Sequence, residues 1–335
     1  MAFLDLKPKA MKTKIVYVLV SNEEDYFLEQ ALMSIYSLRM HNPDVTVELV
    51  TDARTETTLT GKRGTIRSYI NNVLIADVPT EYDNLRRSRH LKVNLRRIVS
   101  GDYLFIDCDT VICKPLDPVD LISSDLGMVA DLNGPLNLTE PFVIEKGLKA
   151  GFSSFEGEPY FNSGVIYAKD TATCHDFYSL WHENWLKSTE NGDPNDQPAL
   201  CEANRQLGRL VHELSGEWNC QIKYFGIHKI TQARIMHYYS GKNTTIPSCE
   251  NLLFYNIKRT GTITDALRKQ LLQYDTTLCT LLTMLPDKTC QYLSSPLVNV
   301  FFNRYRFYRF CERIMLWLNK ATAPIFLLKR TKETS

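Results

Sequence analysis

The sequence predicts an α/β fold built from βαβ units and followed by a helical extension. Apolar runs of strand length alternate with longer segments whose apolar residues recur at helical spacing, which is the pattern of parallel strands joined by helices. From about residue 250 the pattern changes to helix with aromatic and basic residues. The 335 residues suit one large α/β domain with such an extension.

Four strands are expected before residue 110. The first is the apolar run IVYVLV, and the segment after it places Leu28, Leu32 and Ile35 at helical spacing. A second helix, with Leu91 and Leu95 facing inward, delivers the chain to the apolar run DYLFI. The expected strands are 15–20, 46–52, 72–78 and 102–106, and the expected helices are 23–41 and 82–100.

The second half continues this alternation before it changes. LGMVADL and YFNSGVIYA are expected strands over 126–132 and 160–168, and helices follow near 170–187 and 194–207. We therefore expect three segments, which are a basic N-terminal lead over 1–13, an α/β domain over 14–250 and a helical extension over 251–335.

Composition excludes several classes of protein. The 39 Lys and Arg residues and 38 Asp and Glu residues leave a formal charge of +1, so no global field would attract nucleic acid. Nine cysteines without C-x-x-C spacing argue against a zinc site or a disulfide framework and favour free thiols in a reducing compartment. The apolar run 15–20 is too short for a signal peptide or a membrane span. We therefore expect a cytoplasmic protein.

The most informative stretch is DYLFIDCDTVI, where Asp107 and Asp109 emerge from the end of an apolar strand. Carboxylates so close repel each other, whereas a divalent cation neutralises both and bridges to phosphate oxygens. Oxygen ligands favour Mg²⁺ or Mn²⁺ over zinc, and α/β sheets bind ligands beyond the carboxyl ends of their strands. The same spacing also occurs in turns and calcium loops, so on its own it indicates a metal site without establishing one.

A second interpretation of this stretch is a haloacid-dehalogenase-like phosphatase, because Asp107, Asp109 and Thr110 resemble the nucleophile motif of that family. There the first Asp attacks phosphate and the second protonates the leaving group, with Mg²⁺ nearby. That family has the motif on its first strand and a late acidic motif at a strand end. Here the motif follows three expected strands, and the late candidate, 192–196, follows a polar stretch, which disfavours this interpretation.

Five segments together resemble the glycogenin-like retaining glycosyltransferases, glycosyltransferase family eight, in their order along the chain. They are FIDCDT, YFNSGVIYA, NDQPAL, EWN and IMHYYSGK, within about residues 14–242. The resemblance implies a GT-A-type, Rossmann-like mixed sheet flanked by helices. It also implies transfer of a hexose, with retention of configuration, from a nucleotide sugar such as UDP-glucose or UDP-galactose to a glycan or glycolipid acceptor.

The resemblance implies a site as well. Mn²⁺ or Mg²⁺ would be held by Asp107, Asp109 and His237, and would stabilise the departing nucleoside diphosphate. The residues implied to contact the donor sugar are Arg89, Lys92, Asp131, Asn162, Ser163, Gly164, Asp196 and Gln197. The residues implied to line the nucleotide site are Val20, Ser21, Tyr26, Asp107 and Cys108.

Asp196 and Gln197 are the expected catalytic residues. By the resemblance, Asp196 binds sugar hydroxyls and Gln197 lies near the anomeric carbon. An amide is a poor nucleophile, so we expect front-side attack, in which the acceptor hydroxyl enters on the leaving-group side. Gly164 would let the backbone approach the ligand, and Asn162 would hydrogen-bond its hydroxyls.

Each of these assignments has a purely structural alternative. His237 could be a satisfied histidine at a strand end, and residues 162–164 could form a turn. Asp196 could be the N-cap of a helix. Arg89 and Lys92 could belong to a solvated helix face.

The chain departs from the family pattern after His237. Gly241 and Lys242 are shifted and the Pro-Trp pair is missing, which weakens the case for Lys242 as a diphosphate contact. A further alternative, from another class, is a catalytically silent sugar-nucleotide-binding protein, although the intact Asp107, Asp109, His237 and Asp196 count against it.

Near the C-terminus, FFNRYRFYRFCERIMLWLNK is amphipathic, basic and aromatic. Its apolar stripe is Phe307, Cys311, Ile314 and Leu318, and its basic stripe is Arg306, Arg309, Arg313 and Lys320. Such a helix can lie at an anionic membrane surface, so peripheral contact through 300–330 at the inner membrane face would suit a lipid-linked acceptor. The alternative is a helix packed on the α/β domain with a solvated basic face.

Overall fold

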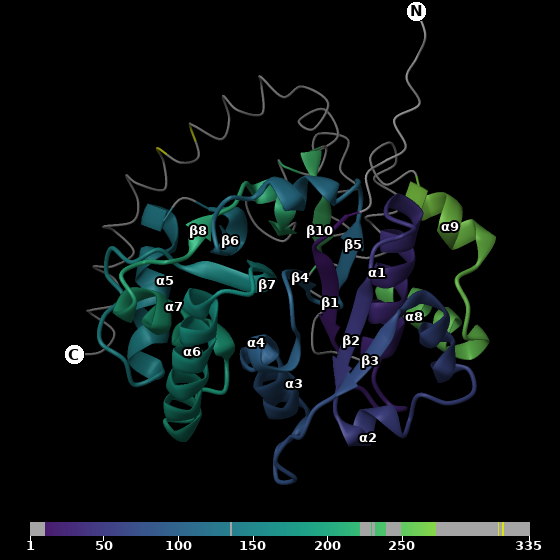
Figure 1. The fold of residues 1–335 in the computed structure, drawn as a ribbon, viewed down its shortest axis with the longest axis horizontal. Helices are drawn as coiled ribbons and strands as arrows, with labels where there is room; N and C mark the ends of the chain where they lie inside the picture. Colours follow the sequence, from purple (N-terminus) through teal and green to yellow (C-terminus); the bar gives the residue numbers. More distant parts are fainter. Residues whose placement is uncertain are drawn as a thin grey trace, which may run out of the picture.

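The computed structural model describes residues 11–134, 136–221, 229, 232–238, 249–272, 314 and 317. In this part of the chain a central sheet of seven strands runs through the molecule in the order β3-β2-β1-β4-β7-β6-β8 (Figure 1). Its strands are β1 (Lys14–Val18), β2 (Val47–Thr51), β3 (Asn72–Ile75), β4 (Tyr103–Ile106), β6 (Leu126–Ala130), β7 (Phe161–Ala168) and β8 (His212–Glu213).

The central sheet is mixed rather than wholly parallel. β1 pairs in parallel with β2 and β4, and β2 pairs in parallel with β3. β7 is antiparallel to both β4 and β6, so its N-terminal end lies beside the C-terminal end of β4. This pairing brings the residues that follow β4 close to the start of β7. Both segments carry polar side chains there, which are Asp107 and Asp109 after β4 and Asn162 and Ser163 in β7.

A smaller sheet adjoins the central one. It consists of β5 (Thr110–Ile112), β9 (Cys220–Gln221) and β10 (Ile235–His237) in the order β5-β10-β9. β10 is antiparallel to β5, and its register sets His237 opposite Thr110. Two segments more than 120 residues apart in the sequence therefore meet directly after β4.

Helices cover both faces of the central sheet. α3, α4, α6 and α7 gather on one face, and α1 with α8 covers the other (Figure 1). The α-helices are α1 (Phe27–His41), α2 (Ala53–Glu56), α3 (Asn84–Val93), α4 (Leu95–Ile98), α5 (Leu136–Lys149), α6 (Ala172–Glu190), α7 (Asp196–Gln206), α8 (Cys249–Thr260) and α9 (Asp265–Leu272). The 3-10 helices are η1 (Arg63–Tyr69), η2 (Asp117–Leu121), η3 (Asp131–Asn133) and η4 (Gly216–Trp218).

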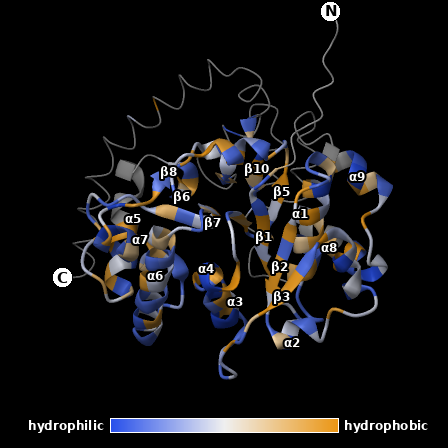
Figure 2. Cartoon of the chain, viewed as in Figure 1, coloured by the Kyte–Doolittle hydropathy of each residue, from blue (hydrophilic) through white to orange (hydrophobic). Residues whose placement is uncertain are grey.

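The alternation of side chains along the strands divides the interior into two cores. In β1, Ile15 and Tyr17 join the core beneath α1, while Val16 and Val18 join the core beneath α3 and α6. Figure 2 shows hydrophobic residues concentrated along β1, β2 and β5. Strands buried on both faces explain why the sequence carries continuous apolar runs rather than alternating ones.

The structure refines several expected boundaries. The helix expected over 23–41 begins at Phe27, because the Asp25 carboxylate accepts from the backbone N–H groups of Asn22 and Phe27 and holds a turn there. The helix expected over 82–100 is two helices that meet at Asn94, whose φ of −105° and ψ of 7° interrupt the helical backbone.

Part of the expected C-terminal extension belongs to the core of the α/β domain. Phe254, Ile257, Leu267 and Leu271 of α8 and α9 are buried in the core that also contains α1. No helix in the described ranges combines the length and apolar character needed to cross a bilayer. The amphipathic stretch expected over 300–330 lies outside the described residues except for Ile314 and Trp317, which are both exposed.

Candidate active site

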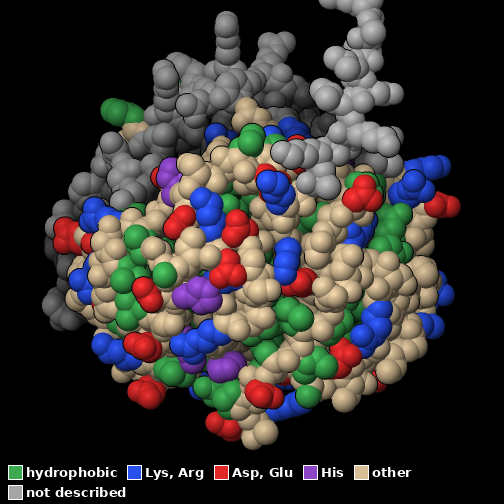
Figure 3. Space-filling view, in the orientation of Figure 1, with side chains coloured by type: hydrophobic (Ala, Val, Ile, Leu, Met, Phe, Trp, Pro, Cys, Tyr) green, Lys and Arg blue, Asp and Glu red, His purple; other side chains and the backbone are tan. Residues whose placement is uncertain are grey.

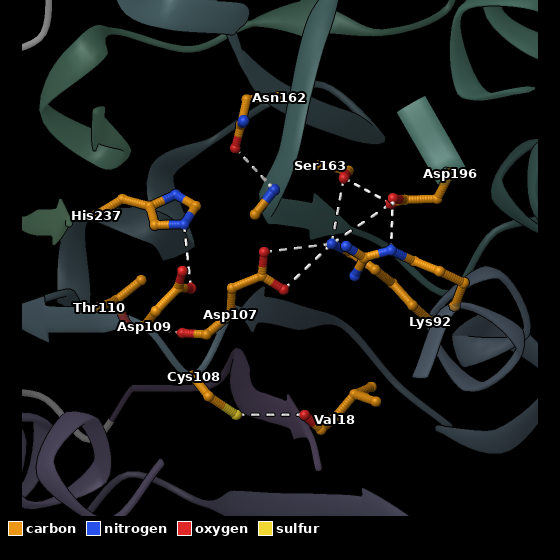
Figure 4. Close-up of polar contacts among 12 residues, drawn as sticks. Val18, Lys92, Asp107, Cys108, Asp109, Thr110, Asn162, Ser163, Asp196 and His237 are labelled. Carbon is orange, nitrogen blue, oxygen red and sulfur yellow. Dashed lines mark hydrogen bonds and ion pairs between the residues drawn. The ribbon is translucent and has the colours of Figure 1, made fainter. Parts of the chain in front are cut away.

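Asp107, Asp109 and His237 meet at the C-terminal end of β4. The two carboxylates follow β4 directly, and His237 ends β10, which pairs with β5 on the far side of the same loop. One ligand atom from each of the three residues lies within 4.8 Å of the other two. His237 Nε2 faces Asp109 Oδ1 at 3.1 Å (Figure 4). The three residues predicted as metal ligands are therefore brought together.

The charges in this cluster strongly affect one another. Burial raises the pKa of Asp107; Lys92 opposes that rise, while the neighbouring Asp109 adds to it. Burial also disfavours the ionised Asp109, but His237 outweighs it and holds the pKa of Asp109 below its usual range. In return, Asp109 raises the pKa of His237 against the opposing effect of burial. A site of two partly buried carboxylates and a buried imidazole is one that a cation stabilises.

A second charged group lies beside the first and is centred on Lys92. Its Nζ lies 3.1 Å from Asp107 Oδ1, 3.2 Å from Ser163 Oγ and 3.5 Å from Asp196 Oδ2 (Figure 4). Arg89 Nε lies 3.0 Å from Asp196 Oδ1. Lys92 is only 2% exposed. The alternative of a solvated helix face is therefore wrong for Lys92, which lies between Asp107 and Asp196.

Asp196 is held by one hydrogen bond and two ion pairs. Ser163 Oγ donates to Asp196 Oδ2 at 2.6 Å, and Arg89 and Lys92 complete the set. Burial disfavours its ionised form, but these two cations outweigh burial and hold the pKa of Asp196 far below its usual range. The helix N-cap alternative is wrong, because Asn195 occupies the N-cap of α7 and the Asp196 carboxylate faces the cations instead.

Asn162 and Gly164 lie against other residues of the site. Asn162 Nδ2 donates to Asp131 Oδ1 at 3.0 Å, and its Oδ1 accepts from the backbone N–H of Gly164 and from Asn219 Nδ2. A Cβ added at Gly164 would lie 2.5 Å from His237 Cε1. The imidazole of His237 takes the space that a side chain at Gly164 would fill, and the approach of a ligand to this backbone stays a prediction.

Gln197 lies at the start of α7, next to Asp196. Its Nε2 donates to the backbone carbonyl of Phe161 at 3.1 Å, which ties α7 to the start of β7. Trp181 of α6 donates to the backbone carbonyl of Asp196 at 2.9 Å. α6 and β7 therefore fix the beginning of α7, where both expected catalytic residues lie.

The loop after β4 is held in place by hydrogen bonds to residues of β1 and α1. Thr110 Oγ1 donates to the Asp107 carbonyl at 2.8 Å and lies 2.7 Å from Ser34 Oγ, which in turn lies 3.0 Å from the Tyr17 hydroxyl. Cys108 Sγ donates to the Val18 carbonyl at 3.3 Å (Figure 4). These buried contacts hold the backbone of the D-x-D stretch against β1 and α1.

The expected nucleotide edge lies at the end of β1. Val20 and Ser21 are buried there, and Ser21 Oγ donates to Asp25 Oδ1 at 2.7 Å. Tyr26 packs against α8, since Lys258 Nζ lies 4.9 Å from the centroid of its ring and the ring of Phe254 lies 6.4 Å away. This contact could not be predicted from the sequence, because no hydrophobic period or motif relates residue 26 to residues 254–258.

The residue that sequence reasoning missed is Asn219. It is fully buried and contacts both Asn162 and His237. The EWN segment pointed to its neighbourhood without giving it a role. Lys242 of the late motif lies outside the described residues. Cys108, Cys113, Cys174, Cys201 and Cys220 are free thiols.

Comparison with solved structures shows which fold this is. The galactosyltransferase LgtC, in complex with donor and acceptor sugar analogs, matches with a TM-score of 0.51 and 16% sequence identity over 77% of this chain and 99% of that one. An active-site mutant of LgtC matches with a TM-score of 0.50 and 15% identity over 76% and 99%. The fold is that of the GT-A glycosyltransferases. Among curated protein sequences, none matches this chain significantly.

The sequence itself gives the family. The profile of glycosyl transferase family 8 matches residues 18–243, which is more than half of the chain and includes Lys92, Asp107, Asp109, Asp196 and His237. The chain belongs to this family and is a glycosyltransferase. The phosphatase interpretation of Asp107 and Asp109 is thereby wrong, and the resemblance noted from the five motifs is confirmed.

Proposed function

We propose that this enzyme transfers a hexose from UDP-glucose or UDP-galactose to a glycan or glycolipid acceptor, with Mn²⁺ or Mg²⁺ as cofactor and with retention of configuration. The observation that carries the proposal is the contact between two clusters. Asp107, Asp109 and His237 form one, and Lys92 joins it to the buried carboxylate of Asp196. A site for a cation and a diphosphate thus adjoins a carboxylate that can accept from sugar hydroxyls.

The donor atoms present suit the proposed cation. Ligand atoms about 2.1 Å from one ion lie about 3 Å apart when adjacent and about 4.2 Å apart when opposite. The three ligand atoms lie within 4.8 Å of one another, so small side-chain rotations give a common coordination sphere. When bound, the cation supplies a Lewis acid for the charge that develops on the departing diphosphate.

The chain's own cations support the same step. Lys92 Nζ is 3.1 Å from Asp107 and 3.5 Å from Asp196, so its charge lies between the metal ligands and the sugar-binding carboxylate. Arg89 holds the other oxygen of Asp196. Because these groups are fixed before the donor binds, they need little reorganisation as the bond to the leaving group breaks.

The contacts of Asp196 and Gln197 favour front-side attack. Asp196 Oδ1 is paired with Arg89, and its Oδ2 accepts from Ser163 and lies beside Lys92, which makes it a poor nucleophile. Gln197 is an amide whose Nε2 donates to a backbone carbonyl. Neither side chain is arranged to form a covalent glycosyl intermediate. Detection of a glycosyl adduct on the enzyme by mass spectrometry would exclude this part of the proposal.

The function is tested by measuring UDP release from a panel of UDP-sugars, with and without Mn²⁺ and glycan acceptors. We expect Asp109→Asn to lower the transfer rate by about 10³-fold, which equals about 4 kcal/mol of transition-state stabilisation. Asp176→Asn, which removes the same charge from the exposed surface of α6, should leave the rate unchanged.

Two outcomes would contradict the proposal. Transfer that persists in excess chelator and in Asp109→Asn would remove the cation from the reaction. The protein could also bind the donor but transfer no sugar to any acceptor and release no UDP. That result would favour the silent sugar-nucleotide-binding protein.

A peripheral membrane contact is the last part of the proposal. The basic and aromatic stretch 300–330 suits an anionic surface, and Ile314 and Trp317 within it are 42% and 67% exposed. An enzyme at the inner membrane face would reach a lipid-linked acceptor from the cytoplasm.

A further inference from the structure

Asn219 lies between η4 and β9, and its buried side chain contacts His237 of the proposed metal site. We propose that Asn219 is a positioning residue that holds His237 in one tautomer, with the ring proton on Nδ1 and the lone pair of Nε2 directed at the cation. The inference rests on the metal-dependent function proposed above and adds a residue that the motifs did not assign.

The backbone N–H of Gly164 is a group that can only donate. The backbone N–H of Gly164 lies 2.9 Å from Asn162 Oδ1, so this atom of Asn162 must be the amide oxygen. At its other end, Asn162 Nδ2 lies 3.0 Å from Asp131 Oδ1, which accepts. Both ends of the Asn162 amide are therefore fixed by partners that allow one orientation.

The orientation of Asn162 then fixes that of Asn219. Asn162 Oδ1 accepts from Asn219 Nδ2 at 2.8 Å, so the nitrogen of Asn219 faces Asn162. Its oxygen consequently faces His237, where Asn219 Oδ1 lies 3.1 Å from Nδ1. An amide oxygen can only accept, so Nδ1 must carry the proton.

The tautomer follows directly. With its proton held on Nδ1 by Asn219, the ring has Nε2 left to bind a cation, and Nε2 is the atom that lies 3.1 Å from Asp109 Oδ1 among the ligand atoms. The ring also packs against Gly164, where a Cβ would lie 2.8 Å from Nδ1. Asn219 and Gly164 thus set the direction and the position of the imidazole.

This role has a measurable consequence. Partners that orient a metal-bound histidine typically contribute 10-fold to 100-fold to metal affinity. Asn42 offers a matched control, because it is also a buried asparagine with a tertiary hydrogen bond, in which its Oδ1 accepts from the Leu116 backbone at 2.8 Å. That bond lies between the end of α1 and η2 rather than at the metal cluster.

The first measurement is the affinity of the full chain for Mn²⁺ in the presence of UDP. Electron paramagnetic resonance of the free Mn²⁺ gives the bound fraction. We expect Asn219→Ala to weaken Mn²⁺ binding by at least 10-fold and Asn42→Ala to change it by less than twofold. Unchanged Mn²⁺ affinity in Asn219→Ala would overturn the role of Asn219 alone. A wild-type chain that binds no Mn²⁺ would overturn the proposed function and this inference together.

The second measurement requires no substitution at Asn219, so it stands even where Asn219→Ala folds poorly. In the wild-type chain loaded with Mg²⁺ and UDP, ¹⁵N-histidine NMR reports which ring nitrogen of His237 carries the proton, with His237→Gln identifying the signal. We expect the proton on Nδ1. A proton on Nε2, or on both nitrogens, would overturn the inference.

Discussion

At Gly164 the absence of a side chain makes room for the imidazole of His237. A Cβ there would lie 2.5 Å from Cε1 of the ring, so Gly164→Ala must displace the ring or the strand. We expect the transfer rate to fall by about 100-fold, because a misplacement of about 1 Å at a reacting site has that effect. Mn²⁺ affinity should fall with it.

The control for this change is Gly127→Ala in the neighbouring strand β6. A Cβ at Gly127 would lie 2.9 Å from Leu214 Cδ2, which is the end of a flexible side chain outside the metal cluster. It should lower the thermal midpoint and leave Mn²⁺ affinity unchanged. Equal Mn²⁺ affinities in the two variants would contradict the role assigned to Gly164.

Asp52 provides a test of acid stability away from the active site. Its carboxylate caps α2 and pairs with Arg87, whose Nε and Nη2 lie 2.5 and 2.6 Å from its two oxygens, with both residues buried. Burial alone would raise the pKa of Asp52, but Arg87 and Thr55 outweigh burial and lower it. Because the folded pKa is depressed, the stabilisation is complete above the ordinary value of 3.8 and is lost as the pH falls through the folded value.

Asp52→Asn should therefore destabilise the protein most near neutral pH. It leaves Arg87 buried without its counter-charge, for which we expect a loss of about 3 kcal/mol at pH 7. In urea unfolding the gap between the wild type and the variant should narrow as the pH falls below about 4. A gap that stays constant down to pH 3 would show that Asp52 contributes no ionic stabilisation.

The candidate site was predictable where its residues stand in short, dense motifs. Asp107 and Asp109 follow an apolar strand, and His237 stands in a late segment typical of the family. Asn219 stands in the EWN motif, but its role could not be predicted, because that role depends on hydrogen bonds to His237 and Asn162, which are far away in the sequence. The role of Gly164 depends on a ring from another sheet, which no local pattern can show.

Elements were predictable where they bury long apolar runs. β1 and β4 coincide with continuous apolar segments, since buried strands read as such runs. β5, β9 and β10 have only two or three residues each, too few for a period to be recognised. The break between α3 and α4 was missed because Asn94 interrupts a helical spacing that continues on both sides.

The packing of α8 against the α/β domain contributes to the stability of the folded core. Phe254 is buried between Tyr26 and Tyr238, with both ring centroids 6.4 Å from its own. Phe254→Ala should lower the free energy of unfolding by about 3 kcal/mol, because it opens a cavity in the core. Its neighbour Tyr255 is 52% exposed, so Tyr255→Ala should cost less than about 0.5 kcal/mol.

Chemical denaturation of both variants measures their free energies of unfolding. The affinity of each variant for UDP is measured as well. Tyr26 lies at the expected nucleotide edge and packs on α8, so loss of Phe254 should also weaken UDP binding. Equal stabilities of the two variants would mean that α8 is not part of the folded core.

At the scale of the whole molecule, the active site draws on distant parts of one chain. Its residues extend from Arg89 to His237 and lie on α3, β7, α7 and β10 and on the loop after β4. Ligand binding therefore stabilises the assembled domain rather than one segment, and a donor at 100 times its dissociation constant adds about 2.7 kcal/mol. Figure 3 shows acidic and basic side chains interspersed over the viewed face, in keeping with the formal charge of +1.

A nearly neutral molecule needs a local basic segment to reach an anionic membrane, and the stretch 300–330 is the candidate. Each Lys or Arg near such a surface contributes about 1 kcal/mol. Reversing Arg306, Arg309 and Arg313 to Glu should therefore lower binding to phosphatidylglycerol vesicles by more than 100-fold in a sedimentation assay. Release of UDP with a soluble acceptor should be unchanged, because no described residue of the active site lies in this stretch. Equal binding to neutral phosphatidylcholine vesicles, or retention of anionic binding in the triple variant, would show that these charges do not direct the enzyme to a membrane.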